Sequence, residues 1–415
     1  MNKNVLAWCL FDFANSSFSA VIAAVVFPVY YTAHIVGNDS GQGDLWWGRA
    51  IAASMAIVAV SSPFLGGIAD YAGIKKRLLI LYTVLCIAAV ASFTVLRQGM
   101  VVEGFFLIVL ATVGLEGGTV FYNAFLPEIA GPQQQGRVSA WGFAIGYAGS
   151  ILSLLIALAL IENGVLVFVW PMVALFFGIF SLPAFLILPR DSGGGAGIRS
   201  AAVNGFRQSM VQLRRIVQNR DQRRFLLAFL IYEDGVNTVI VFSSVFAATT
   251  LGFAPRELVL LYLVVQVTAL AGAFALARPI DVWGPKRVVL LSLCLWTTVA
   301  VAAFFITSKA HFFFVASCAG LGLGTIQAAS RAFYVQFIPP GKSSEYFGVY
   351  SMVGKTSAVL GPLIFGYLST AFNSQRPAVL AISSFFVAGL AIVMTVRGGG
   401  PNSNGRNAED SGQNF

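Results

Sequence analysis

Charged residues are scarce in this chain of 415 residues: Asp, Glu, Lys and Arg make up 10% of it, whereas 57% of its residues are hydrophobic. Soluble globular proteins have about 25% charged and about 45–50% apolar residues. So few charges cannot cover so much apolar surface in water. The composition therefore excludes an ordinary soluble domain and predicts a chain that is solvated by lipid.

Residues that bind metals or form disulfides are also few. The sequence has two histidines, His34 and His311, far apart in the chain. The four cysteines all lie inside apolar runs and form no C-x-x-C pair: Cys9, Cys86, Cys294 and Cys318. We therefore predict no metal site, no cofactor and no disulfide framework, and interpret the cysteines as buried small hydrophobic residues.

Long apolar runs dominate the sequence instead. A helix needs about 20 mostly apolar residues to cross the hydrocarbon core of a bilayer. Twelve such runs are separated by Pro, Gly and charged clusters: 5–33, 46–69, 78–97, 104–127, 138–161, 165–188, 224–250, 257–278, 288–307, 311–336, 345–371 and 377–396. Their apolar residues are continuous rather than alternating, which excludes a β-barrel. The sequence predicts an all-α membrane protein with twelve transmembrane helices.

The lysines and arginines indicate the orientation of these helices. The net charge is +9, but the basic residues lie in short gaps rather than on one face, which argues against nucleic-acid binding. With the N-terminus inside, 19 of the 26 basic residues fall on the cytoplasmic side and five on the other. Because cytoplasmic loops are enriched in Lys and Arg, we expect both termini in the cytoplasm and the protein in a bacterial inner membrane.

Residues 190–223 separate six apolar runs from the next six. Within them, apolar residues recur at helical spacing while arginines occupy other faces: Val203, Phe206, Met210, Leu213 and Val217. This pattern predicts an amphipathic helix on the anionic inner leaflet, with a solvated linker helix as the alternative. We expect an N-terminal bundle of residues 1–189, this linker, a C-terminal bundle of residues 224–397 and a disordered tail of residues 398–415.

The two halves repeat a loop motif, D-x-x-G-x-K-[KR], after the second and the eighth run. Its glycine permits a tight turn, and its aspartate can cap the helix that follows. Its basic residues suit lipid headgroups. Together with two arginines outside the motif, these residues form the predicted cytoplasmic gate: Asp70, Gly73, Lys75, Lys76, Arg77, Arg137, Asp281, Gly284, Lys286, Arg287 and Arg331.

The repeated loop and the six-plus-six layout resemble the major facilitator superfamily. The opening W-C-L-F-D-F-A-N-S-S from Trp8, N-A-F-L-P-E-I from Asn123 and Y-E-D-G-V from Tyr232 resemble, more narrowly, the vacuolar amino-acid effluxers of autophagy and their bacterial relatives. The resemblance covers roughly residues 5–396. It implies two pseudo-symmetric six-helix bundles and transport of a small solute by alternating access.

Polar residues in the middle of the predicted spans are candidates for the substrate site. A charge at the centre of a membrane helix costs about 2.5–3.5 kcal/mol or more, and such transporters bind substrate near the midplane. A rise of about 1.5 Å per residue places Asp12, Glu116, Asp234 and Lys355 there. The predicted substrate-binding residues are Asp12, Asn15, Glu116, Asn123, Asp234, Asn237, Gln327 and Lys355. Structural ion pairs and polar contacts between helices are the alternatives.

These charges suit a zwitterion such as an amino acid. We expect Lys355 to bind a substrate carboxylate, and Asp12, Asp234 or Glu116 to bind an ammonium group. The adjacent carboxylates of Glu233 and Asp234 would not both ionise readily. The candidate proton carriers are Asp234, Glu233 and Asp12.

The sequence thus predicts a monomeric secondary transporter of a small polar solute. The resemblance implies amino-acid efflux, with proton coupling left open. Proton-coupled uptake of another metabolite and a non-transporting receptor or scaffold are the alternatives. An enzyme is not expected, because the chain has no H-E-x-x-H or G-x-S-x-G motif, and ATP drive is not expected, because it has no phosphate-binding loop.

Overall fold

The computed structural model describes residues 2–37, 42–193, 198–357, 360–372 and 374–397, and every regular element in these ranges is a helix. The first half consists of α1 (Lys3–Ser17), η1 (Phe18–Val25), α2 (Phe27–Val29), η2 (Tyr30–Val36), α3 (Gln42–Ala72), α4 (Lys75–Ser92), η3 (Phe93–Val95), α5 (Val101–Ala124), α6 (Leu126–Ile129), α7 (Gln135–Glu162), η4 (Leu166–Phe168) and α8 (Val169–Ile187). The predicted tail, residues 398–415, lies outside the described residues.

The second half begins after the linker helix α9 (Ile198–Gln218). It consists of α10 (Arg220–Leu251), α11 (Pro255–Trp283), α12 (Pro285–Phe305), α13 (Lys309–Val335), α14 (Ser343–Thr356), α15 (Leu360–Ala371) and α16 (Gln375–Thr395). Eleven helical segments of the described chain are long and apolar enough to cross a membrane. The remaining predicted run, 345–371, corresponds to α14 and α15. The twelve-helix fold predicted from the apolar runs is confirmed.

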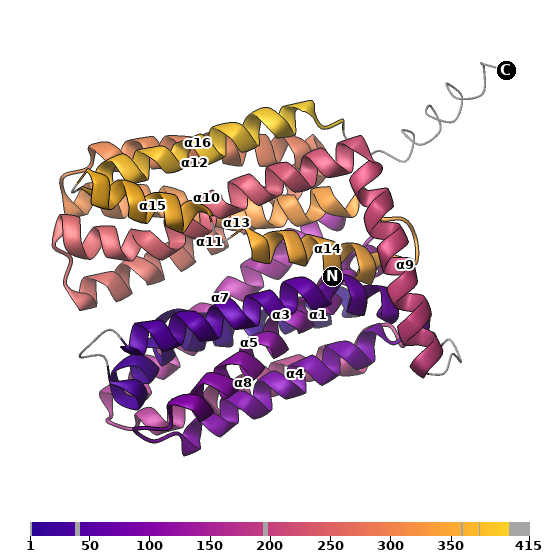
Figure 1. The fold of residues 1–415 in the computed structure, drawn as a ribbon. Coiled ribbons are helices and arrows are strands. Elements are labelled where there is room, and N and C mark those ends of the chain that lie inside the picture. Colours follow the sequence, from indigo (N-terminus) through magenta and orange to yellow (C-terminus); the bar gives the residue numbers. More distant parts are fainter. Residues whose placement is uncertain (1, 38–41, 194–197, 358–359, 373, 398–415) are drawn as a thin grey trace.

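The helices form two bundles that lie side by side (Figure 1). Helices α3 and α14 pack against each other across the two halves, and so do α7 and α11. Large apolar side chains remain exposed on the outside, for example Val60 (67%) and Phe314 (70%). Such a surface suits lipid rather than water.

One end of the bundles is more tightly joined than the other. We call it the basic end; its loops are 73–74, 130–134, 188–193, 284 and 336–342. The main buried cluster contains residues of both halves, such as Trp8 and Phe333. The second half has a separate small cluster around Phe246, Phe253 and Phe312 toward the opposite end.

Two of the four cysteines correct the interpretation from sequence. Cys9 and Cys86 are buried as expected, but Cys294 is exposed and Cys318 is half-buried. The prediction of four buried thiols was therefore wrong for these two. An apolar run in a membrane helix does not reveal which of its faces meets lipid and which meets protein.

Candidate functional site

An ion pair joins the last turn of α14 in the second half to the body of α5 in the first half. Lys355 on α14 lies with its Nζ 2.6 Å from Oε2 of Glu116 on α5, and the two side chains are 26% and 18% exposed. Two predicted substrate-binding residues, one from each half, therefore lie in direct contact. Removing one partner of a poorly solvated pair leaves an uncompensated charge, which costs about 3–5 kcal/mol when the pair is buried.

A second carboxylate interacts with the same lysine. Glu233 on α10 is buried and interacts electrostatically with Lys355. Its Oε1 accepts a hydrogen bond of 2.7 Å from Nε2 of Gln327 on α13. Its Oε2 is buried and has no hydrogen-bond partner among the described residues. Lys355 thus interacts with one carboxylate from each half.

Asp12 belongs to a different cluster. Its Oδ1 accepts a hydrogen bond of 3.3 Å from Nδ2 of Asn15, one helical turn further along. Its other polar neighbours are the Tyr122 hydroxyl and the Arg331 guanidinium. The structure therefore brings Asp12, a predicted substrate-binding residue, next to the predicted gate residue Arg331, with Asn15 bound to Asp12.

Asp234 and Asn237 connect α10 to the start of α15 and to Ser357, the C-cap residue that follows α14. Both carboxylate oxygens of the buried Asp234 accept from the backbone N–H of Gly361, at 2.9 and 3.0 Å, in the first turn of α15. Nδ2 of Asn237 donates to the hydroxyl of Ser357 at 3.3 Å. These contacts lie within the second half and hold its helices together.

Arg331 on α13 makes the densest set of contacts between the halves. Its side chain is 2% exposed. It donates to Oδ1 of Asn123 at 2.9 Å, to the Ser139 hydroxyl at 2.8 Å and to the Ser139 carbonyl at 2.7 Å. The guanidinium also lies over the rings of Trp8 and Phe143, 4.7 and 4.2 Å from their centroids. Asn123, predicted to bind substrate, is thus a partner of Arg331.

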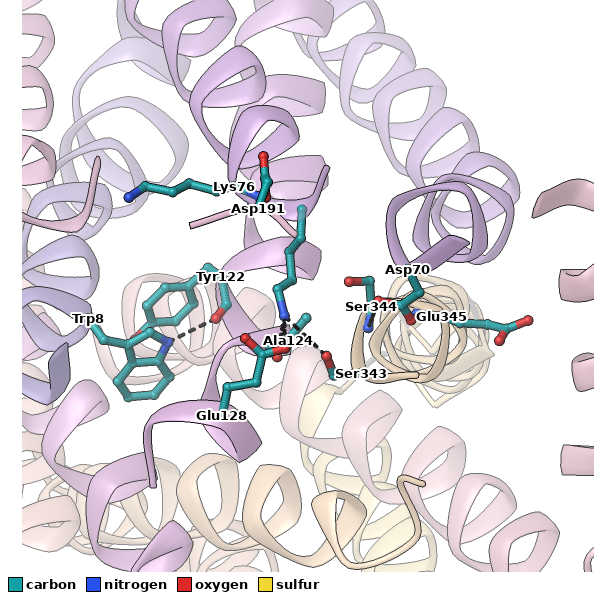
Figure 2. A network of polar contacts seen from close by, with 11 residues as sticks. Trp8, Asp70, Lys76, Tyr122, Ala124, Glu128, Asp191, Ser343, Ser344 and Glu345 are labelled. Atoms are coloured by element: carbon teal, nitrogen blue, oxygen red, sulfur yellow. Dashed lines mark hydrogen bonds and ion pairs between the residues drawn. The ribbon is translucent and has the colours of Figure 1, made fainter. Parts of the chain in front are cut away.

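The two motif aspartates cap helices of the opposite half. Asp70, at the end of α3, accepts from the N–H groups of Ser344 and Glu345 at 3.1 and 2.9 Å, in the first turn of α14. Figure 2 shows Asp70 next to these two residues. Asp281 accepts from the N–H of Arg137 at 3.0 Å, in the first turn of α7. A carboxylate at a helix N-terminus is stabilised by the unpaired N–H groups and the helix dipole.

The prediction that each aspartate caps the helix after it was wrong. The N–H groups of Lys76 and Arg77 that begin α4 donate instead to Asp191, at 2.7 and 3.1 Å. Helix α12 begins without a side-chain cap. Asp70 and Asp281 lie in the last turns of α3 and α11. The motif glycines Gly73 and Gly284 then turn the chain with φ of 61° and 86°.

Lys75 joins three helices at the basic end. Its Nζ contacts the carboxylate of Glu128 and lies 3.4 Å from both the Ala124 carbonyl and the Ser343 hydroxyl. Figure 2 shows Glu128, Ala124 and Ser343 gathered together. Lys75 thereby ties the first half to the start of α14.

The other basic motif residues act within their own half. Nζ of Lys76 donates to the Leu188 carbonyl at 2.7 Å, and Nζ of Lys286 donates to the Met394 carbonyl at 3.0 Å. Nε of Arg77 lies 3.7 Å from Asp191. Arg287 is exposed. Some residues of the predicted gate thus form contacts between the two halves, and others form contacts within one half.

Several residues that make these contacts at the basic end were missed by the sequence analysis. Glu128, Ser139, Ser343 and Glu345 lie near helix ends, and Asp191 lies in the loop after α8. Polar residues are common at such places and need no special reason. Glu128 and Ser139 had a signal, since they belong to the segments N-A-F-L-P-E-I from Asn123 and G-R-V-S from Gly136, which carry the family resemblance.

Two cavities lie away from the basic end. One of about 230 Å³ has Glu116 in its wall, together with mainly apolar residues of η1, α3 and α5 such as Ile22, Trp47 and Ala111. Another of about 290 Å³ lies between the halves, lined by residues such as Tyr30, Leu158 and Leu263. Glu116 of the ion pair is therefore adjacent to a cavity, whereas Arg331 lines neither of these two cavities.

The aspartate caps lead to a stability prediction. We expect Asp70→Ala and Asp281→Ala each to lower the free energy of unfolding by about 1–2 kcal/mol, because a helix N-terminus loses its carboxylate acceptor. The two losses should be close to additive, since the caps act on separate helix pairs. Thermal unfolding of the detergent-solubilised protein measures the effect, with Glu162→Ala, an exposed acid at the opposite end, as control. Equal stability of the Asp70 variant and this control would contradict the cap.

Comparisons with known proteins agree with this arrangement. A family model described as "Vacuole effluxer Atg22 like" matches residues 49–399. YxiO, an uncharacterized MFS-type transporter of Bacillus subtilis, is 27% identical over 417 residues, which cover 95% of each chain. Autophagy-related protein 22-1 of Neosartorya fischeri is 26% identical over 63% of this chain and 48% of its own length.

A solved structure shows the same fold. The human organic anion transporter MFSD10 (TETRAN) superposes with a TM-score of 0.76 over 94% of this chain and 98% of its own, at 14% identity. Such identity supports the fold alone. The family match, by contrast, spans most of the sequence. This protein therefore belongs to the Atg22-like vacuole effluxer family and is a membrane transporter of the major facilitator superfamily type.

Proposed function

We propose that this transporter moves a small zwitterion, most specifically an amino acid, by alternating access of two bundles, residues 1–189 and 224–397. The observation that carries the proposal is the Glu116–Lys355 pair, which brings one charge of each bundle into direct contact. The ammonium of a zwitterion can take the place of Lys355 beside Glu116, and its carboxylate can take the place of Glu116 beside Lys355. Binding would then link the two bundles through the solute.

The surroundings of the pair favour this exchange of partners between the protein and the solute. Lys355 also interacts with Glu233, so it keeps a negative partner while its contact with Glu116 is exchanged for substrate. The cavity of about 230 Å³ beside Glu116 has space for the apolar part of a small solute. The family description, vacuole effluxer, favours export as the direction.

We propose that the basic end is cytoplasmic, because it carries most of the lysines and arginines. Both termini would then be cytoplasmic, and the chain would work as a monomer in a bacterial inner membrane. In this arrangement Asp70, Asp281, Arg331, Lys75 and Arg137 form the closed cytoplasmic gate. Asp12, Asn15 and Asn123 support this gate through Arg331.

We propose Glu233 as the proton carrier in place of Asp234. Both carboxylate oxygens of Asp234 accept from the N–H of Gly361 in the first turn of α15. Protonation of Asp234 would weaken this contact between α10 and α15. Glu233 is buried, and its Oε2 has no hydrogen-bond partner among the described residues. It also interacts with Lys355, so a proton on Glu233 changes the charge balance at the substrate site.

Transport by the purified protein in liposomes tests the proposal. We expect liposomes loaded with unlabelled amino acids to exchange them for labelled ones, and empty liposomes to show no exchange. A folded protein that exchanges no amino acid but moves another class of metabolite would support the uptake alternative. A protein that moves no solute from a broad panel would support a receptor or scaffold.

The Glu233→Gln variant tests proton coupling. We expect it to keep exchange within about twofold of the wild type but to lose about 10-fold or more of the accumulation driven by a pH gradient, because it cannot carry the proton. Labelled amino acid is followed with and without the gradient. Glu103→Gln, an exposed acid at the opposite end, is the matched control. A variant that still responds fully to the gradient would remove Glu233 from the coupling step.

A further inference from the structure

The linker helix α9 lies across the basic end, transverse to the membrane-crossing helices (Figure 1). One of its faces packs on the last turns of α3. Nδ2 of Asn204 donates to the Tyr71 hydroxyl at 3.2 Å, and the hydroxyl of Ser209 donates to the Pro63 carbonyl at 3.2 Å. Gly205 lies so close to Ile68 that an added Cβ would be 2.7 Å from the Cα of that residue.

A second face of α9 is apolar and exposed except at Leu213, which is half-buried. We call it the apolar stripe: Val203, Phe206, Met210, Leu213 and Val217. At about 100° per residue these five side chains lie on one side of the helix, next to the face that packs on α3. Val203 is 61% exposed, Phe206 49% and Val217 51%. Phe206 also stacks on Phe64 of α3, with ring centroids 4.6 Å apart.

Arginines border the apolar stripe along one edge. Arg214 and Arg207 occupy the edge of the stripe that is farther from α3, and both are exposed. Residues 198–218 contain four arginines and no acidic residue. An apolar stripe bordered by arginines, at the level where the spanning helices end, matches the boundary of a bilayer with negatively charged headgroups.

Helix α9 also contacts both sides of the proposed gate. The segment of α3 on which it packs includes Pro63 and Tyr71, which flank Asp70, the cap of α14. Arg215 of α9 interacts electrostatically with Glu345 in the first turn of α14. If the basic end opens, α3 and α14 separate, and α9 must release one of them.

We propose that α9 binds anionic phospholipid of the adjacent leaflet and, when bound, holds the basic end closed. The arginines contact the headgroups, and the apolar stripe contacts the start of the acyl chains. Because a ligand shifts an equilibrium only by its difference in affinity for the two states, the lipid must bind more tightly to the closed state. The proposal rests on the proposed gate but not on the identity of the solute, and its tests use no solute.

Lipid titration tests the binding step. We expect phosphatidylglycerol, but not phosphatidylcholine with the same chains, to raise the unfolding temperature of the full-length protein in detergent. Each basic residue near an anionic surface strengthens binding about fivefold to sixfold. The double variant Arg207→Gln/Arg214→Gln should therefore weaken the apparent affinity for phosphatidylglycerol about 30-fold. Arg49→Gln/Arg97→Gln, which removes two exposed charges at the opposite end, should leave the affinity unchanged. Equal losses in both double variants, or an equal effect of soluble glycerol phosphate, would overturn the proposal.

Labelling of a buried cysteine tests the coupling step. Ala328 on α13 is fully buried at the basic end, and its carbonyl accepts from Ser139 of the other half. In a chain whose native cysteines are replaced by alanine, we expect Ala328→Cys to react with a soluble maleimide several-fold faster in phosphatidylcholine nanodiscs than in phosphatidylglycerol nanodiscs. Adding Val203→Gln/Met210→Gln should abolish the difference between the lipids. Equal rates in both lipids without these changes would show that α9 does not hold the gate.

Discussion

Liposomes that contain the Lys355→Met variant are expected to exchange solute at least about 30-fold more slowly than wild-type liposomes. Truncating one partner of a desolvated charge pair costs about 2–5 kcal/mol or more. The substrate carboxylate loses its positive partner. Glu116 and Glu233 both interact with Lys355 in the structure. In the variant, their carboxylates lose this positive partner as well. Exchange of labelled solute at saturating concentration measures the loss.

A charge exchange separates binding from stability. The double variant Glu116→Lys/Lys355→Glu keeps an ion pair at the same position, so we expect its thermal stability to recover much of what Lys355→Met loses. Transport should stay absent, since the positive charge now belongs to the other bundle and a second carboxylate lies near Glu233. Transport at the wild-type rate in either variant would contradict the assignment of this pair to the substrate site.

A second lysine–glutamate pair is a natural control. Lys309 and Glu257 lie 2.7 Å apart at the opposite end, with side chains that are 42% and 36% exposed. We expect Lys309→Met to leave both exchange and stability nearly unchanged, because exposed ion pairs are well solvated. Lys309→Met and Lys355→Met are the same substitution in a lysine–glutamate pair, so the two variants differ only in where the pair lies.

Replacing Arg331 should open the basic end. We expect Arg331→Met to increase maleimide labelling of the Ala328→Cys reporter about 10-fold or more, because leaving buried partners of a charged group unpaired costs several kcal/mol. The variant removes all three hydrogen bonds to Asn123 and Ser139 and the contacts with two aromatic rings. Only part of this loss should be recovered by Arg331→Lys, since an ammonium cannot reproduce the planar fork of the guanidinium.

Two results would argue against this role of Arg331. The first is equal labelling of Arg331→Met and of Arg278→Met, which removes an exposed arginine of α11. The second is full recovery in the lysine variant, which would show that charge alone matters. A variant that fails to fold is recognised by its thermal unfolding, and Asn123→Ala, which removes one hydrogen bond, then gives a milder version of the same test.

Much of the architecture was predictable because membrane helices are determined by local composition. The turn at Gly73 and its repeat at Gly284 could likewise be read from a short motif. The site was less predictable. Depth along a helix follows from its rise per residue, so Asp12, Glu116, Asp234 and Lys355 were all expected near the midplane. Of these four, Glu116 and Lys355 lie in contact with each other, Asp12 lies near Arg331, and Asp234 accepts from Gly361.

The amino-acid sequence by itself determined that this chain crosses a membrane many times, where its apolar runs lie, and which charges they carry into the lipid. Hydrocarbon imposes those features residue by residue, because it solvates neither exposed backbone nor unpaired charge. Tertiary structure decided which partner each charge meets. Asp70 caps α14 rather than α4, and Asp12 lies near Arg331 rather than Lys355. Such choices depend on how whole helices pack and rotate against each other, and no short segment contains that information.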